Sequence, residues 1–133
     1  MIQNTGRFRP SRNSCPILPW FRAAKGWQLI RGYLMQEDVS EAWNGFLQGR
    51  EALLSGRYDL VIFDEINIAL DYGLLPLEEV LQMLEERLAQ ADVVLTGRNA
   101  PQEIIDAADL VSEVREIKHP YCNGVRARKG MEF

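Results

Sequence analysis

The first 36 residues of this 133-residue chain contain no aspartate or glutamate. They carry six basic residues and three prolines, namely Arg7, Arg9, Arg12, Arg22, Lys25 and Arg31 with Pro10, Pro16 and Pro19. The segment has no dense basic run and no amphipathic period, which argues against a nucleic-acid-binding arm and against an organelle-targeting segment. We therefore expect residues 1–36 to form an irregular basic segment that lies on a domain made by residues 37–133.

Other features are scarce as well. The two cysteines, Cys15 and Cys122, have neither metal-binding nor redox spacing, so a reducing cytoplasm is the expected compartment. No apolar run approaches the roughly 18 residues of a membrane helix. The composition, 47% hydrophobic with a net charge of -4, is that of one globular domain with a modest core. These features predict neither a membrane partner nor a nucleic-acid partner.

From residue 37 onward, the apolar residues follow regular helix and strand periods. Their spacing predicts helices near 38–55, 76–89 and 101–107, and strands near 59–63, 92–95 and 110–117. Gly56 is the predicted stop of the first helix, and Asn99 with Gln102 matches a capping box before the third. Helices that alternate with strands predict an α/β fold, with a parallel sheet, right-handed crossovers and helices on both faces.

Charged residues follow two of the predicted strands directly. Asp64 and Glu65 come after the apolar run "LVIF", and "TGR" at 96–98 ends the second strand. Ligands of open parallel sheets bind beyond the carboxyl ends of the strands, so we expect these residues to face one crevice. An apolar strand followed by Asp-Glu is the pattern of a Walker B element, where a carboxylate holds magnesium beside nucleotide phosphates. Acids that merely cap the turn after a strand are the alternative.

Four blocks of sequence, in order, carry a resemblance to a known family. They read "YDLVIFDEINIALDYGLLPLEEVL", "VVLTGRNAP", "AADLVSEVREIKHPY" and "GVRARKGMEF". Over about residues 37–133 the chain resembles the corrinoid (cob(I)alamin or cob(I)yrinic acid a,c-diamide) adenosyltransferases of the CobA/BtuR type. The resemblance implies a RecA-like P-loop NTPase fold and a homodimer. It also implies transfer of the 5′-deoxyadenosyl group of ATP to the cobalt of a reduced corrinoid, with release of triphosphate.

The resemblance implies roles for individual residues. Cobalt is the nucleophile, so no side chain is expected to attack the ribose. Glu65 is the implied ligand of Mg²⁺ (or Mn²⁺) with Asp64 beside it, and Arg98 is the implied contact of the triphosphate. Trp27, in "AAKGWQLIRGY", is the candidate for a corrinoid contact, with a core or surface tryptophan as the alternative. Before about residue 26 the sequence does not resemble that of the family.

Two features near the C-terminus each allow two interpretations. His119, the single histidine, is either a ligand of a metal or of cobalt, or a capped side chain before a proline turn. The cluster Arg126, Arg128 and Lys129 either meets the rim of a corrinoid or forms a solvated tail. Cys122 stands where the family more often has an acidic residue.

One element of the implied family is missing from the sequence. A P-loop needs a glycine-rich turn that ends in Gly-Lys-Ser/Thr, and none of the three lysines, Lys25, Lys118 and Lys129, follows a glycine. We therefore expect the first strand and the P-loop to be absent, and the chain alone to be inactive. Three explanations remain for the missing P-loop: a truncation or gene-model error, a split enzyme with a separate P-loop chain, or a non-catalytic corrinoid-binding or interaction remnant.

Overall fold

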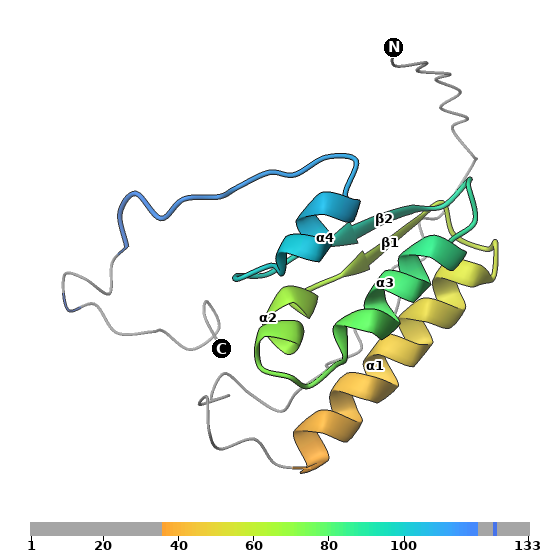
Figure 1. The fold of residues 1–133 in the computed structure, drawn as a ribbon, viewed down its shortest axis with the longest axis horizontal. Helices are drawn as coiled ribbons and strands as arrows, with labels where there is room; N and C mark the ends of the chain where they lie inside the picture. Colours follow the sequence, from red (N-terminus) through yellow and green to blue (C-terminus); the bar gives the residue numbers. More distant parts are fainter. Residues whose placement is uncertain (1–35, 120–123, 125–133) are drawn as a thin grey trace.

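The computed structural model describes residues 36–119 and residue 124. The elements follow in the order α1 (Gln36–Leu54), β1 (Leu60–Phe63), α2 (Ile66–Asp71), α3 (Leu77–Glu86), β2 (Asp92–Leu95) and α4 (Gln102–Ala107). Figure 1 shows α1 and α3 side by side next to the two strands. The predicted α/β class is confirmed, and so are the three predicted helices and the first two predicted strands. None of the helices in the described part is both long and apolar enough to cross a membrane.

The two strands pair in parallel, with Leu60 opposite Asp92 and Phe63 opposite Leu95. Parallel strands need a crossover connection, and α2 with α3 supplies it here. The predicted third strand is wrong, because residues 110–117 are irregular. Leu110, Val114 and Ile117 are each at least 85% exposed. A strand needs a hydrogen-bonded neighbour, and neither described strand pairs with this segment.

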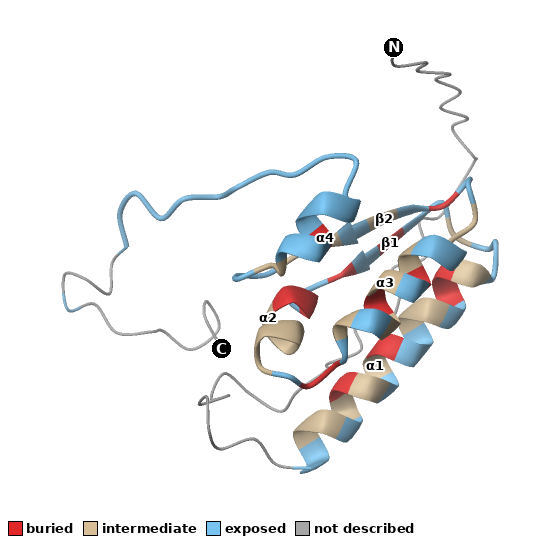
Figure 2. Ribbon diagram, viewed as in Figure 1, coloured by how far each residue is buried: buried red, intermediate tan, exposed pale blue. Residues whose placement is uncertain are grey.

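The core lies between one face of the sheet and the two long helices, α1 and α3. Val61 and Phe63 are buried on this face, and Figure 2 shows the buried residues gathered between strands and helices. The Phe63 ring lies 6.4 Å from the ring of Phe46 on α1. Gly49, also on α1, leaves room for the Phe63 ring, because a Cβ at this position would lie 2.3 Å from Phe63 Cε1. From α3, Val80 adds a fully buried side chain.

The opposite face of the sheet is open in the described part of the molecule. Leu60, Ile62 and Val94 are 48%, 56% and 41% exposed. Helices were predicted on both faces, and this part of the prediction is wrong for residues 36–119, where no helix buries these three side chains. The reason is physical: α1 and α3 pack on the side to which Val61 and Phe63 point, and alternate residues of a strand point to opposite sides.

Charged side chains tie the two long helices together above the core. Arg50 of α1 forms an ion pair with Glu79 at 3.6 Å and a hydrogen-bonded ion pair with Glu86, both on α3. α1 ends at Leu54, and Gly56 follows with a φ of +67°, which fits its predicted role as the stop. Because α1 ends where β1 begins, its first turn lies toward the carboxyl ends of the strands (Figure 1).

Candidate functional site

The two segments that follow β1 and β2 are joined through the hydroxyl of Thr96. Its Oγ1 donates a hydrogen bond to Asp64 Oδ1 at 2.6 Å and accepts one from the backbone N–H of Glu65 at 2.9 Å. The backbone N–H of Thr96 in turn donates to the carbonyl of Phe63 at 3.1 Å. One side chain therefore orients the Asp64 carboxylate and the backbone of Glu65 at the carboxyl edge of the sheet.

Glu65 has an unusual backbone for a side-chain-bearing residue. Its φ is +61°, in the left-handed region, and it is the N-cap of α2. Such a conformation costs about 1–2 kcal/mol outside glycine. It turns the chain sharply from strand into helix and leaves the carboxylate exposed. Glu65 Oε2 lies over Gly97, only 3.2 Å from where a Cβ on Gly97 would be.

Asn67 is the buried polar residue of this region, with 5% of its surface exposed. Its backbone N–H donates to the carbonyl of Thr96 at 3.1 Å, and its Nδ2 donates to the carbonyl of Gly97 at 3.5 Å. Its Oδ1 is buried and has no hydrogen-bond partner among the described residues. Leaving a buried acceptor unpaired costs about 1–3 kcal/mol. Asn67 is not among the residues predicted from the sequence, although an amide between the apolar residues of "INIAL" is a signal that points to it.

The turn that carries Arg98 is tied to α2 at its far end too. Asn99 has a φ of +58°, and its Nδ2 donates to Asp71 Oδ2 at 3.0 Å. The predicted capping box is therefore wrong: Pro101 is the N-cap of α4, without a side-chain hydrogen bond. Asn99 cannot cap that helix because its side chain is engaged with α2. Arg98 itself is exposed, and its two neighbours, Gly97 and Asn99, are each held by a hydrogen bond to α2.

We call Asp64, Glu65, Asn67, Thr96, Gly97 and Arg98 the carboxyl-edge site. It presents two exposed carboxylates and one exposed guanidinium at the ends of two paired strands. Among the described residues, no group of three or more His, Cys, Asp or Glu side chains could enclose a metal ion. Two exposed carboxylates would suit Mg²⁺ rather than an all-protein metal site, because Mg²⁺ keeps several waters and binds through one or two carboxylates together with phosphate oxygens.

Of the remaining sequence-derived candidates, His119 alone lies within the described residues. Trp27, the Arg126–Lys129 cluster and both cysteines lie outside the described residues, so their roles stay predictions. His119 is exposed at the end of the described range.

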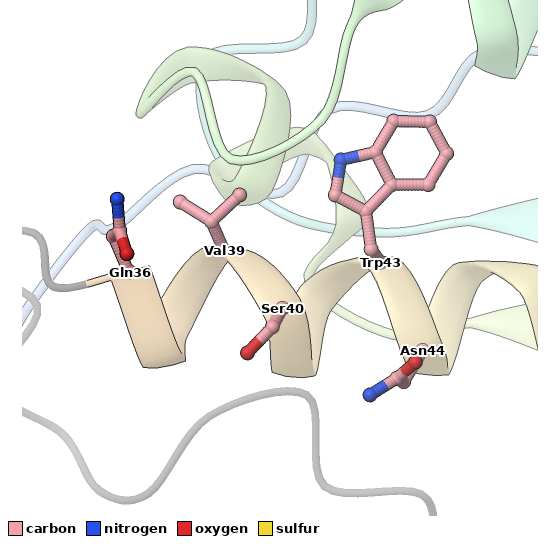
Figure 3. A pocket seen from close by; sticks show the side chains of 5 residues that line it. All are labelled: Gln36, Val39, Ser40, Trp43 and Asn44. Atoms are coloured by element: carbon pink, nitrogen blue, oxygen red, sulfur yellow. The ribbon is translucent and has the colours of Figure 1, made fainter.

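A shallow hollow lies along the first half of α1 and is lined by Gln36, Val39, Ser40, Trp43 and Asn44. Figure 3 shows Val39 and Trp43 projecting from one side of the helix, and Ser40 and Asn44 from another. Trp43 also packs edge-on against Phe46 at 5.9 Å between ring centroids, so it belongs in part to the core. The hollow contains none of the residues of the carboxyl-edge site.

The fold and the site define a class: an α/β protein with an acidic strand end and an Arg-bearing turn at one edge of a parallel sheet. The model of the family "ATP:corrinoid adenosyltransferase BtuR/CobO/CobP" matches residues 9–133. The chain belongs to this family.

Curated relatives support the same assignment. A corrinoid adenosyltransferase of a Sinorhizobium species is 43% identical over 97 residues, covering 72% of this chain and 45% of the relative. Those of Pseudomonas aeruginosa and Escherichia coli K12 are 40% and 39% identical over 98 residues, covering 74% of this chain and 48% and 50% of the relatives. The chain thus spans about half the length of these relatives.

Proposed function

We propose that this chain forms the metal- and triphosphate-facing part of an ATP:corrinoid adenosyltransferase. In that reaction the electron pair of reduced cobalt forms a bond to the ribose C5′ of ATP, and the C5′–O bond breaks. Triphosphate leaves with the bonding electrons. The observation that carries the proposal is the Thr96 hydroxyl, which holds the Asp64 carboxylate and the Glu65 backbone together at the strand ends.

The chemical demand on the protein is to place C5′ in line with cobalt and to neutralise the leaving group. Glu65 would hold Mg²⁺ directly, and Asp64 would either share the ion or orient its water. A bound Mg²⁺ neutralises the charge on the phosphate oxygens. Asp64 is suited to this role because Thr96 already fixes one of its oxygens, at 2.6 Å, while the carboxylate remains exposed.

Arg98 would contact the triphosphate from the second strand end. An arginine forms short, charge-assisted hydrogen bonds to phosphate oxygens, worth about 1.5–3 kcal/mol each. Its exposure and its place between the anchored residues Gly97 and Asn99 leave the guanidinium accessible to a ligand. Trp27 remains our candidate for the corrinoid contact.

The open face of the sheet suggests what completes the site. We infer that a P-loop segment, supplied in the same polypeptide or as a separate chain, covers Leu60, Ile62 and Val94 and completes a RecA-like sheet. The length of the relatives, about twice the matched part, leaves room for such a segment. The working enzyme would be a cytoplasmic homodimer.

A second function rests on the same apolar surface. The open face, together with the exposed residues Leu110, Val114 and Ile117, would also suit a non-catalytic interaction module. The two functions differ in their dependence on the carboxylates, since an interaction module needs neither Asp64 nor Glu65.

Adenosylation of cob(I)alamin tests the proposal. We expect no measurable product from the 133-residue chain alone, and product when a P-loop segment from a relative is fused upstream or supplied as a second chain. In the completed enzyme, Glu65→Gln should lower kcat by at least tenfold and leave the unfolding midpoint unchanged, because it removes a ligand charge from an exposed position.

Glu85→Gln is the matched control, since Glu85 is an exposed carboxylate on α3, away from the strand ends. Equal activity of the Glu65→Gln and Glu85→Gln enzymes would refute the metal role. Full activity of the chain alone would refute the need for a P-loop segment.

A further inference from the structure

The Asn67 side chain occupies a place where an apolar residue of the same size would be expected. It is as buried as its neighbour Ile66, at 5% exposure each. Within residues 36–119 its Oδ1 has no partner, and its one side-chain hydrogen bond there, to Gly97, is long at 3.5 Å. Packing alone does not account for this amide, because an unpaired buried acceptor is a net cost and buried polar groups are otherwise almost always satisfied.

The amide acts on the peptide that leads into Arg98. The carbonyl of Gly97, which accepts from Asn67 Nδ2, belongs to the peptide group between Gly97 and Arg98. The preceding carbonyl, of Thr96, accepts from the backbone N–H of Asn67. One residue therefore holds two successive carbonyls of the turn. Glycine suits position 97, because its φ is +122° and a Cβ there would lie only 3.1 Å from the Cβ of Asn67.

We propose that Asn67 is a positioning residue, which fixes the Gly97–Arg98 peptide and thereby the direction in which the Arg98 side chain leaves the sheet edge. This inference rests on the proposed function, in which Arg98 and Glu65 must meet one metal-bound triphosphate at a fixed separation. The unpaired Oδ1 is the by-product, since an amide that supplies the donor also brings a carbonyl.

Substitutions at Asn67 in the full chain, labelled with ¹⁵N, test this role. Asn67→Leu removes both amide groups, and Asn67→Asp keeps the shape while it removes the donor. Asn44→Leu makes the same chemical change at an exposed position of α1 and is the control. Both Asn67 variants should shift and broaden the backbone amide signals of Gly97 and Arg98 while those of Val80 and Met83, in the core, stay unchanged. Asn67→Leu should also keep or raise the urea midpoint.

A second measurement reports on the site rather than on the turn. Mn²⁺ held at Glu65 should broaden the Arg98 Nε–H signal in the parent chain, and this broadening should fall several-fold in both Asn67 variants, because the Arg98 side chain then loses its fixed direction, and stay constant in Asn44→Leu. A purely structural asparagine would lower the urea midpoint without this effect.

Unchanged Gly97 and Arg98 signals in a folded Asn67 variant would overturn the proposal, and so would changes that extend equally to Val80 and Met83. If Asn67→Leu does not fold, Asn67→Asp decides. Absence of any Mn²⁺ effect in the parent chain would instead contradict the proposed metal site, and the Gly97 and Arg98 signals would still decide the role of Asn67.

Discussion

Alternate residues of β1 meet two unlike environments although their side chains are alike. Val61 and Phe63 are 3% and 9% exposed beneath α1 and α3, whereas Leu60 and Ile62 are 48% and 56% exposed. All four are apolar, as expected of a strand that is covered on both faces. The apolar composition of β1 is therefore that of a strand with both faces covered. Among the described residues only one face is covered, so we expect a further layer over Leu60 and Ile62.

The largest expected difference between the covered and the open face of β1 is in the stability lost when a side chain on each is truncated. Phe63→Ala, on the covered face, should lower the free energy of unfolding by about 3–5 kcal/mol, because it leaves a cavity under α1. Ile62→Ala, one position earlier and 56% exposed, should lower it by less than about 1 kcal/mol. Urea unfolding of the isolated chain measures both. Equal losses would mean that the face described as open is covered in solution, and a loss at Ile62 that depends on protein concentration would identify a second copy of the chain as the cover.

A smaller effect is expected where α1 approaches the covered face. Gly49→Ala places a Cβ within 2.3 Å of the Phe63 ring, so the ring or the helix must move. Overpacking of this kind costs about 1–3 kcal/mol, and the better helix propensity of alanine offsets about 1 kcal/mol of it. We expect a net loss of about 1 kcal/mol. In the Phe63→Leu background the same change should become neutral or stabilising. Gln48→Ala, at an exposed position of α1, is the control.

The smallest effect should come from the ion pair that ties α1 to α3. The hydrogen bond from Arg50, followed by that from Gln82, lowers the pKa of Glu86 below its ordinary value. A carboxylate whose pKa is lower in the folded state contributes stability above its unfolded pKa and loses it as the pH falls through the folded pKa. Arg50→Met should therefore raise the Glu86 pKa. The urea midpoint should then fall less as the pH drops through the folded-state pKa of Glu86. An NMR titration of the Glu86 carboxyl carbon provides the check, and an unchanged pKa in Arg50→Met would contradict the assignment.

The elements that could be predicted are those whose signal is local. The helical stripe in α3 and the short apolar runs of β1 and β2 specify an element within a few residues. Residues 110–117 have a strand-like pattern too, but a strand also requires a neighbour, and that requirement is not written in the segment itself. The six-residue α2 was not predicted because it is barely longer than one helical turn.

The site was predicted as a position but not as a set of interactions. Asp64, Glu65 and Arg98 could be placed at strand ends from the strand boundaries alone. The hydrogen bonds from Thr96 to Asp64 and from Asn67 to Gly97 join residues that are 32 and 30 positions apart in the sequence. Such contacts follow from the register of the sheet, which the sequence pattern does not specify. The capping box at Asn99 failed for the same reason, since Asp71 on α2 engages that side chain.

The contact between Asp64 and Thr96 also has a consequence for the order of folding. The two residues are 32 positions apart, and closing a flexible loop of that length costs about 3 kcal/mol in chain entropy. Isolated helices form within about a microsecond, whereas parallel strand pairing must first overcome this entropic cost. The carboxyl-edge site should therefore assemble late in refolding. A chain arrested before β2 docks on β1 would show helical circular dichroism and have no site at all.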